Sequence, residues 1–386
     1  METQGAQLKT ENSKLKTSGT AAQVEVAGYL RAEHVQRMSA TPRRFAAIDC
    51  GTNTFTMLVV DVASGPAAEG GGGPRWRECF RLRLPVRLGE GGFKAGQIAP
   101  DRFARGLDAL GVLRECARNL GVSEIKVVGT SALRGAANGA DFAAAVQRRL
   151  GWDLRIIDGL EEARLIHVGA SAAYVPAPGD RVLTLDIGGG SVEAIVWQDR
   201  AVPLGSVSTD AGVGRVAAIA APGDPMGELG AQRLAPFLAD VMEPIRRLIA
   251  EHRPRILLGA SGSFDTFADL AEGAAPPGGH RLARSVDRRA LQEVFDRLRM
   301  ASARERLTMP GMAPDRVDFM PISAEIVRCV LGWMEGEVEG EVEDENEVEG
   351  GFAGRDVHAG RRGVEVVCSP FALREGVVEV EVGGWG

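Results

Sequence analysis

The alternation of hydrophobic and polar positions divides the first half of the chain into short strands and longer helices. Two apolar runs flank a turn and predict a hairpin, and a third alternating run follows it. The predicted strands are residues 45–49, 55–62, 76–86, 125–128 and 154–157, and the predicted helices are residues 100–120, 140–150 and 161–173. An opening hairpin followed by alternating helices and strands predicts an α/β domain.

The same order of patterns begins again near residue 182. The predicted strands of this half are residues 182–186, 192–197, 202–208, 256–258 and 364–368; helices are expected within 227–251, between the turn at 261–263 and about residue 333, and over 371–378. Because both halves open with a strand, an acid, a glycine turn and a second strand, we interpret them as a duplication; two unrelated hairpins are the alternative. We expect residues 371–378 to close the second domain and residues 379–386 to be frayed.

Composition separates two segments from these domains. Residues 1–43 are rich in Lys, Glu, Thr, Ser and Ala and predict a disordered extension, with a candidate short helix at 24–38. Residues 335–362 are predicted to be an acidic low-complexity insertion. Gly-Glu and Val-Glu dipeptides repeat within it, and the like charges of such a block repel one another and disfavour folding. The predicted domains are therefore residues 44–170 and residues 171–334 plus 363–379.

Charge and cysteine content narrow the function classes. Nine acidic residues and no basic residue lie between Glu335 and Glu349, and without them the net charge of −7 becomes +2. A nearly neutral folded part is compatible with an anionic substrate and gives no nucleic-acid footprint. The five cysteines show no Cys-x-x-Cys pair, so neither a zinc site nor a disulfide framework is indicated. The sequence has no membrane-spanning apolar run and no signal-peptide core, so we expect a cytoplasmic protein that does not bind membranes.

Two glycine-containing turns carry the first candidate chemistry. Small residues let a backbone approach a ligand, and successive N–H groups in such a turn bind anions. The candidate phosphate-binding residues are Gly51, Thr52, Asn53 and Thr54 in the first loop (residues 49–54) and Gly188, Gly189, Gly190 and Ser191 in the second loop (residues 186–191). Either loop alone is an ordinary turn, but the pair, each at the head of an α/β unit, predicts a phosphate clamp across an interdomain cleft.

An acidic residue ends the first strand of each unit. A carboxylate cannot contact a phosphate directly, so it must act through a cation or a water. Asp186 and Glu193 flank the second loop and are candidate Mg²⁺ ligands, directly or through water, and Asp49 is a third. Their alternative role is that of capping or surface acids.

A further cluster follows the strand at 125–128. The carboxyl end of a strand is where open α/β sheets bind ligands, and Arg134 lies just beyond it, able to hold phosphate oxygens bidentately. A solvated arginine is the alternative. Glu161 and Glu162 fall in the first turn of a predicted helix, where the helix dipole alone would explain them.

Seven runs, in order and spacing, together resemble the exopolyphosphatase / guanosine pentaphosphate phosphohydrolase (Ppx/GppA) family. These runs are residues 47–54, 87–91, 129–134, 159–165, 186–191, 259–263 and 373–376. The resemblance implies two duplicated actin-like domains (ribonuclease H-like, ASKHA superfamily) around a central cleft. It also implies hydrolysis of terminal phosphoanhydride bonds, either of inorganic polyphosphate with release of orthophosphate or of guanosine pentaphosphate to the tetraphosphate.

Site roles follow from the same resemblance. It implies that Glu162 is the general base, although the sequence separates it poorly from Glu161. Asp186 and Glu193 then correspond to acids associated with a divalent metal such as Mg²⁺, Arg134 to a phosphate-gripping residue and the two loops to the phosphate binders. A homodimer is the assembly it suggests. The family usually has Thr at Val192, so we expect a slightly weaker set of phosphate-facing hydroxyls.

Three questions stay open at this level. A non-catalytic sensor of polyphosphate or guanosine alarmones, or an ATP-dependent kinase of the same superfamily, would share the loops; the run at 159–165 disfavours the kinase. Polyphosphate and guanosine pentaphosphate present the same terminal group. Arg81, Arg83 and Arg87 either line a polyanion track or form the outward face of an alternating strand.

Overall fold

The computed structural model describes residues 43–62, 75–200, 202–260, 262–274, 283–336 and 363–383. The expectations for the N-terminal extension with its candidate helix, and for the part of the acidic insertion from 337 to 362, lie outside these residues. Ser261 of the turn at 261–263 also lies outside them.

The first half forms a five-stranded sheet in the order β3-β2-β1-β4-β5. Its elements are β1 (Arg43–Cys50), β2 (Thr54–Val62), β3 (Trp76–Pro85), α1 (Pro100–Asn119), β4 (Glu124–Gly129), α2 (Ser131–Arg134), α3 (Gly139–Leu150), β5 (Leu154–Ile156) and α4 (Gly159–Ala173). β1, β2 and β3 are antiparallel neighbours, whereas β4 pairs in parallel with β1 and with β5. The predicted hairpin and the order of helices and strands are confirmed.

The second half repeats this topology, with β6 in the place of β1 and the sheet order β10-β11-β9-β6-β7-β8. Its strands are β6 (Val182–Ile187), β7 (Val192–Trp197), β8 (Gly205–Thr209), β9 (Ile256–Ala260), β10 (Arg284–Ser285) and β11 (Glu365–Ser369). Its helices are α5 (Val213–Ala220), α6 (Gly227–Val241), α7 (Glu243–His252), α8 (Gly262–Glu272), α9 (Arg288–Met300), α10 (Ala303–Arg306), α11 (Met320–Glu335) and α12 (Leu373–Val378). The predicted stretch at 227–251 is two helices, because Pro244 at the start of α7 lacks an N–H for the preceding turn. The shared strand order supports the duplication.

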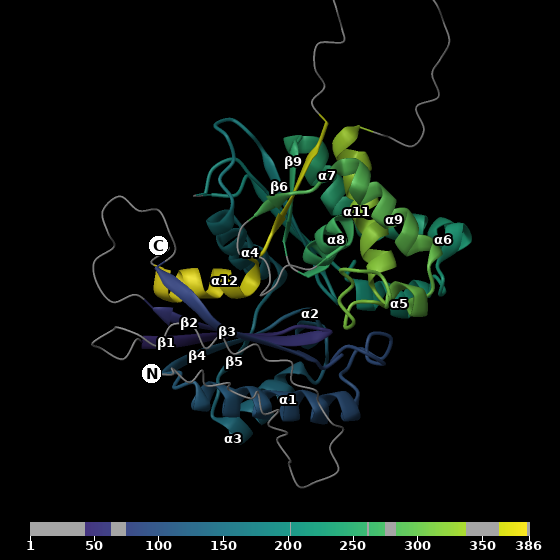
Figure 1. Cartoon of the computed structure of the whole chain (residues 1–386). Coiled ribbons are helices and arrows are strands. Elements are labelled where there is room, and N and C mark those ends of the chain that lie inside the picture. Colours follow the sequence, from purple (N-terminus) through teal and green to yellow (C-terminus); the bar gives the residue numbers. More distant parts are fainter. Residues whose placement is uncertain are drawn as a thin grey trace, which may run out of the picture.

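The two sheets enclose a pair of helices between them (Figure 1). α1 and α3 cover the outer face of the first sheet, and α7, α8, α9 and α11 lie on the far side of the second. α4 and α12 lie in the middle, where one apolar cluster joins residues of both sheets, including Phe45, Leu58, Ile195 and Trp197. The two halves therefore share a common core.

The two middle helices exchange partners between the halves. α4 belongs to the first half by sequence, yet it packs on β7 and β8 of the second sheet. α12 follows the last strand of the second half, yet it packs on α4 and on β1 of the first sheet. We expected residues 371–378 to close the second domain; instead Leu373, Val377 and Val378 bury their side chains in the shared core.

The chain continues beyond α12 in helical conformation, so the expectation that residues 379–383 are frayed is wrong. A short π-helix spans Glu379–Gly383. Trp76 Nε1 of β3 donates a hydrogen bond of 2.9 Å to the buried carboxylate of Glu379, and Lys126 of β4 lies 3.3 Å from Glu381. These contacts anchor the end of the described chain to the first sheet.

Two glycines allow α4 and α12 to cross with their backbones in contact. A Cβ atom at Gly169 of α4 would lie 2.1 Å from the carbonyl oxygen of Ala372, and one at Gly376 of α12 would lie 1.8 Å from that of Leu165. Neither backbone atom can move without displacing its helix. The crossing therefore requires glycine at both positions.

We predict that Gly376→Ala destabilises the protein by about 1–3 kcal/mol or more, because the added methyl group forces the two helices apart. Gly111→Ala is the matched control: it lies within α1, and a Cβ atom there meets nothing within 4 Å. The control is expected to be stabilising by up to about 1 kcal/mol, the difference in helix propensity between Ala and Gly. Urea unfolding followed by circular dichroism measures both, and equal midpoints for G376A and wild type would contradict the described crossing.

Candidate active site

The first and second loops meet tip to tip. The first joins β1 to β2 and the second joins β6 to β7, so the duplicated topology brings equivalent turns together. A Cβ atom at Gly189 would lie 2.7 Å from the Asn53 side-chain amide, and one at Gly190 would lie 2.5 Å from Thr52 Oγ1. This contact agrees with the expectation that the loops face one another, and it explains why the second loop needs consecutive glycines.

The second loop rests on the start of α5. The N–H groups of Val213 and Gly214 donate to the carbonyl oxygens of Gly188 and Gly189 at 3.0 and 2.8 Å. A Cβ atom at Gly212 would lie 2.3 Å from the backbone nitrogen of Ser191. The carbonyl side of the loop is thus held by α5.

Three predicted acidic residues face the layer between the sheets. Asp186 and Glu193 are cross-strand partners in the β6–β7 hairpin, and both are buried, with Glu193 only 1% exposed. Glu162, in the first turn of α4, is 7% exposed. The packing of α4 on the second sheet brings Glu162 to this hairpin. Glu162 lies close enough to Glu193 to raise its pKa, as Asp186 also does.

Strand parity corrects one expectation about this hairpin. Successive side chains of a strand point to opposite faces, so Val192 points away from the face that carries Glu193. Val192 is fully buried in the core on the far side of the second sheet. The valine therefore removes no hydroxyl from the phosphate-facing set, and the expected weakening is wrong.

Arg134 holds Glu162 in place. Arg134 Nη1 donates to Glu162 Oε2 at 2.9 Å and to the carbonyl oxygen of Ile157, also at 2.9 Å. Burial raises the pKa of Glu162 to about 7; Arg134 opposes the rise, and Asp49 and Asp186 add to it. The result is a carboxylate fixed in orientation, with a pKa near neutrality.

The neighbouring Glu161 lies on the other side of α4. Its carboxylate accepts hydrogen bonds from Arg155 and Arg164, at 2.9 and 2.8 Å, on the exposed face of the helix. The hydrogen bond from Arg164, together with the charges of both arginines, lowers the pKa of Glu161. The two acids that the sequence could not separate thus occupy different environments, and only Glu162 faces the buried site.

Asp49 occupies the position in the first half that Asp186 occupies in the second. Burial raises the pKa of Asp49 to about 7, with Arg374 opposing the rise and Asp186 adding to it. Arg374 Nη1 lies 3.7 Å from Asp49 Oδ2. Within the described residues, Asp49 Oδ1 and Thr52 Oγ1 are buried and have no hydrogen-bond partner. These atoms are available to a ligand or its solvent shell.

The acidic cluster has an electrostatic cost. Burial raises the pKa of Glu193 well above its ordinary range; Glu162 and Asp186 add to the rise, and the Ser208 hydroxyl, which donates to the Glu193 carboxylate at 2.7 Å, opposes it. A bound cation would offset the repulsion. Among the described residues no three His, Cys, Asp or Glu side chains form a complete metal site.

The three arginines of the β3 region pair with the second half. Arg81 bonds to the buried carboxylate of Glu375 at 2.7 Å, Arg83 to Asp315 at 2.7 Å, and Arg87 to Asp318 at 2.8 Å. The interpretation of these residues as an outward strand face is therefore wrong. Their side chains link the first sheet to α12 and to the segment before α11.

Arg215 was not among the predicted site residues. It donates to the carbonyl oxygen of Gly190 at 3.0 Å and also lies beside Ser131 of the first half. A signal was present, because glycines at 212 and 214, at the start of a helix, indicate a close backbone approach.

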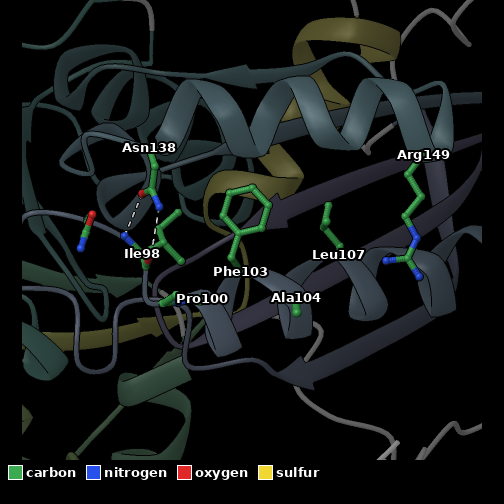
Figure 2. Close-up of a pocket in the computed structure, with 8 residues that line it drawn as sticks. Ile98, Pro100, Phe103, Ala104, Leu107, Asn138 and Arg149 are labelled. Atoms are coloured by element: carbon green, nitrogen blue, oxygen red, sulfur yellow. Dashed lines mark hydrogen bonds between the residues drawn. The ribbon is translucent and has the colours of Figure 1, made fainter. Parts of the chain in front are cut away.

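A groove of about 410 Å³ lies elsewhere, between α1 and α3 (Figure 2). Phe103 and Leu107 line it with other largely apolar residues, and Asn138 bonds to both backbone groups of Ile98 at its edge. No predicted site residue contributes to its lining. We therefore place the candidate site at the facing loops, where the chemically active groups meet.

Of the described helices, none combines the length and apolar character needed to span a bilayer.

The fold and the site define a protein of the actin-like superfamily, built from two duplicated α/β halves with phosphate-type loops at their junction. The model of the Ppx/GppA phosphatase family matches residues 71–344, and the chain belongs to that family. Exopolyphosphatase 1 of Mycobacterium tuberculosis (strain ATCC 25618 / H37Rv) is 28% identical over 274 residues, which is 71% of this chain and 77% of the relative.

Solved structures agree with this assignment. An exopolyphosphatase from Cytophaga hutchinsonii matches with a TM-score of 0.73 and 27% identity, covering 89% of this chain and 98% of its own. The Ppx/GppA family member of Aquifex aeolicus matches with a TM-score of 0.66 and 19% identity, covering 89% of this chain and 98% of its own. The latter likeness supports the fold. The predicted fold class and family are confirmed.

We predict that Glu193→Gln stabilises the protein by about 0.5–2 kcal/mol in alkaline buffer without divalent cations, because at high pH it removes a charge that burial and the neighbouring Glu162 and Asp186 disfavour. Glu325→Gln is the contrasting control, since Glu325 is also buried but pairs with Arg299 at 2.8 Å. Breaking that pair is expected to be destabilising by about 3 kcal/mol. Urea unfolding in the presence of a chelator measures both, and a loss of stability in E193Q would contradict the repulsion.

Proposed function

We propose that this protein is an exopolyphosphatase that hydrolyses the terminal phosphoanhydride bond of inorganic polyphosphate and releases orthophosphate. Membership of the Ppx/GppA phosphatase family supports a phosphohydrolase. The mycobacterial and Cytophaga relatives named above are both exopolyphosphatases, which supports polyphosphate as the substrate. The observation that carries the proposal is the buried Glu162, fixed by Arg134 beside the two facing loops.

The terminal phosphoryl group binds between the loops. Backbone N–H groups of residues 51–54 and 189–191 would meet its negative charge, the N–H of Gly188 being bonded to the Ser191 carbonyl oxygen, and the unpaired hydroxyl of Thr52 is a ready donor. Arg134 adds positive charge at the same place. Phosphoryl transfer requires mainly positioning and charge stabilisation, which these groups supply.

Glu162 acts as the general base. Its carboxylate accepts the proton of the attacking water and orients that water in line with the departing oxygen. A base is most effective when its pKa lies near the working pH, and burial brings the pKa of Glu162 to about 7. Arg134 keeps the carboxylate pointed at the site, since its own position is fixed by the Ile157 carbonyl.

The residues present fit a divalent cation such as Mg²⁺. Asp186, Glu193 and Asp49 would hold it directly or through water, and the unpaired Asp49 Oδ1 and the mutual repulsion of the acids support this assignment. When bound, Mg²⁺ would neutralise charge on the phosphate oxygens.

Arg83, Arg316 and Arg374 lie close enough together to influence one another electrostatically, and Asp315, which is paired with Arg83, partly compensates their charge. Burial and the neighbouring Arg316 lower the pKa of Arg83 to about 9, and Arg374 contributes in the same direction. Burial also lowers the pKa of Arg316. Arginines gathered this closely favour a ligand with several phosphates. Guanosine pentaphosphate carries the same terminal group and is tested alongside polyphosphate.

We predict that Glu162→Gln lowers turnover of polyphosphate by about 10²–10⁴-fold, because glutamine cannot accept the proton of water. Glu161→Gln, the adjacent exposed acid, is expected to retain turnover near that of wild type. Release of orthophosphate from polyphosphate of several lengths and from guanosine pentaphosphate measures both. Wild-type rates in E162Q would refute the base assignment. A wild-type protein that binds polyphosphate but releases no orthophosphate would instead be a sensor.

We predict that Asp186→Asn raises the Mg²⁺ concentration needed for half-maximal activity by about tenfold or more, because one anionic ligand is lost. Mg²⁺ should also raise the unfolding temperature of the wild type more than that of the variant. Asp153→Asn, which removes an exposed acid ahead of β5, is the control. An unchanged Mg²⁺ dependence in D186N would remove Asp186 from the metal site.

A further inference from the structure

Two arginines hold the candidate phosphate loops in the same manner from opposite halves. Arg87 follows β3 in the first half, and Arg215 lies in α5 of the second half. Each bonds to the loop of its own half through its backbone, and each sends its guanidinium group across to a phenylalanine of the other half. Neither residue takes part in the hydrolysis described above.

Arg87 connects the first loop to the segment before α11. Its backbone N–H donates to the carbonyl oxygen of Asn53 at 2.7 Å. Its guanidinium group pairs with Asp318 at 2.8 Å and lies over the ring of Phe319, 5.9 Å from the centroid. The tip of the first loop is therefore tied, through one residue, to the second half.

Arg215 makes the reciprocal connection. Its backbone N–H donates to the carbonyl oxygen of Gly189 at 3.1 Å, and its Nε donates to that of Gly190 at 3.0 Å. Its guanidinium group lies over the ring of Phe93 in the first half, 4.9 Å from the centroid, and Nη2 is 3.4 Å from Ser131 Oγ. Gly190 and Asn53 occupy equivalent places in the two loops. Their carbonyl oxygens are bonded by the Arg215 side chain and by the Arg87 backbone N–H, respectively.

The backbone of Arg87 supports a functional constraint at this position. Its φ angle is +54°, in the left-handed region that a bulky side chain rarely adopts. A glycine would fit that conformation without strain, yet the chain has an arginine there. Residues held in such a conformation cluster at ligand clamps and switch regions.

We propose that Arg87 and Arg215 are positioning residues that form a reciprocal clasp, coupling contact between the two halves to the geometry of the two phosphate loops. The expected effect on turnover rests on the proposed function, whereas the expected coupling between the loops does not. An arginine suits this task because its planar group stacks on a ring and forms directional hydrogen bonds at the same time. Closure of the halves would thereby fix both loops together.

The test compares Arg87→Gly, Arg215→Lys, Phe319→Leu and Phe93→Leu with wild type. Arg87→Gly removes the side chain and also relieves the backbone conformation, so a loss of activity cannot be assigned to backbone strain. Arg233→Ala is the control, because Arg233 also donates to a carbonyl oxygen, that of Pro222, but entirely within the second half. Orthophosphate release from polyphosphate gives kcat and KM, and hydrogen exchange followed by mass spectrometry reports on peptides covering each loop.

We expect R87G and R215K to lower kcat about tenfold or more, since misplaced loops lose alignment of the phosphoryl group, with R233A like wild type. We also expect each phenylalanine variant to speed hydrogen exchange in the loop of the opposite half. F319L should speed exchange in the first loop, and F93L in the second loop. A purely local structural role would leave the loop of the opposite half unchanged.

Wild-type kcat and wild-type exchange in R87G and R215K would overturn the clasp while leaving the proposed hydrolysis intact. Faster exchange in F319L or F93L that stays confined to the half carrying the substitution would also overturn it. If the wild type released no orthophosphate from any phosphoanhydride, the proposed function would fail. The exchange measurements would then decide on the clasp by themselves.

Discussion

The arrangement of the site depends on the close crossing of α4 and α12 between the two sheets. Gly169 and Gly376 allow the helix backbones to touch, and this contact fixes how the two helices lie against each other. The first turn of α4 carries Glu162 to the β6–β7 hairpin, while the start of α12 brings Arg374 to Asp49. The close backbone contact that these two glycines allow thus sets the positions of Glu162 and Arg374, which are distant from each other in sequence.

The acidic cluster at the candidate site destabilises the fold, because several acids lie close together away from solvent. Glu162 and Glu193 are buried and Asp49 is partly buried, and burial raises the pKa of each. Elsewhere in the shared core a buried acid has a clear partner, as Glu379 has in Trp76. At the site the compensating charges are fewer than the acids require. The cation proposed above for this site would offset that imbalance.

Much of the fold followed from local patterns, because each half repeats a hairpin and the periodicities of its helices and strands are strong. The identity of the phosphate loops also came from local sequence. Glu161 and Glu162 could not be separated, because the rotation of α4 about its axis depends on the second sheet, which the local pattern does not contain. Val192 was misplaced although strand parity relative to Glu193 was available. Arg87 and Arg215 were missed as a pair because their contacts join residues more than a hundred positions apart.

The exchange of middle helices also bears on how this chain acquires its structure. Each sheet has one face covered by helices of its own half and one face covered largely by a helix from the other. A half produced alone would expose the apolar residues that now meet its partner's helix, among them Phe45 in the first half and Trp197 in the second. We therefore expect the two halves to fold as one cooperative unit, each completing the core of the other.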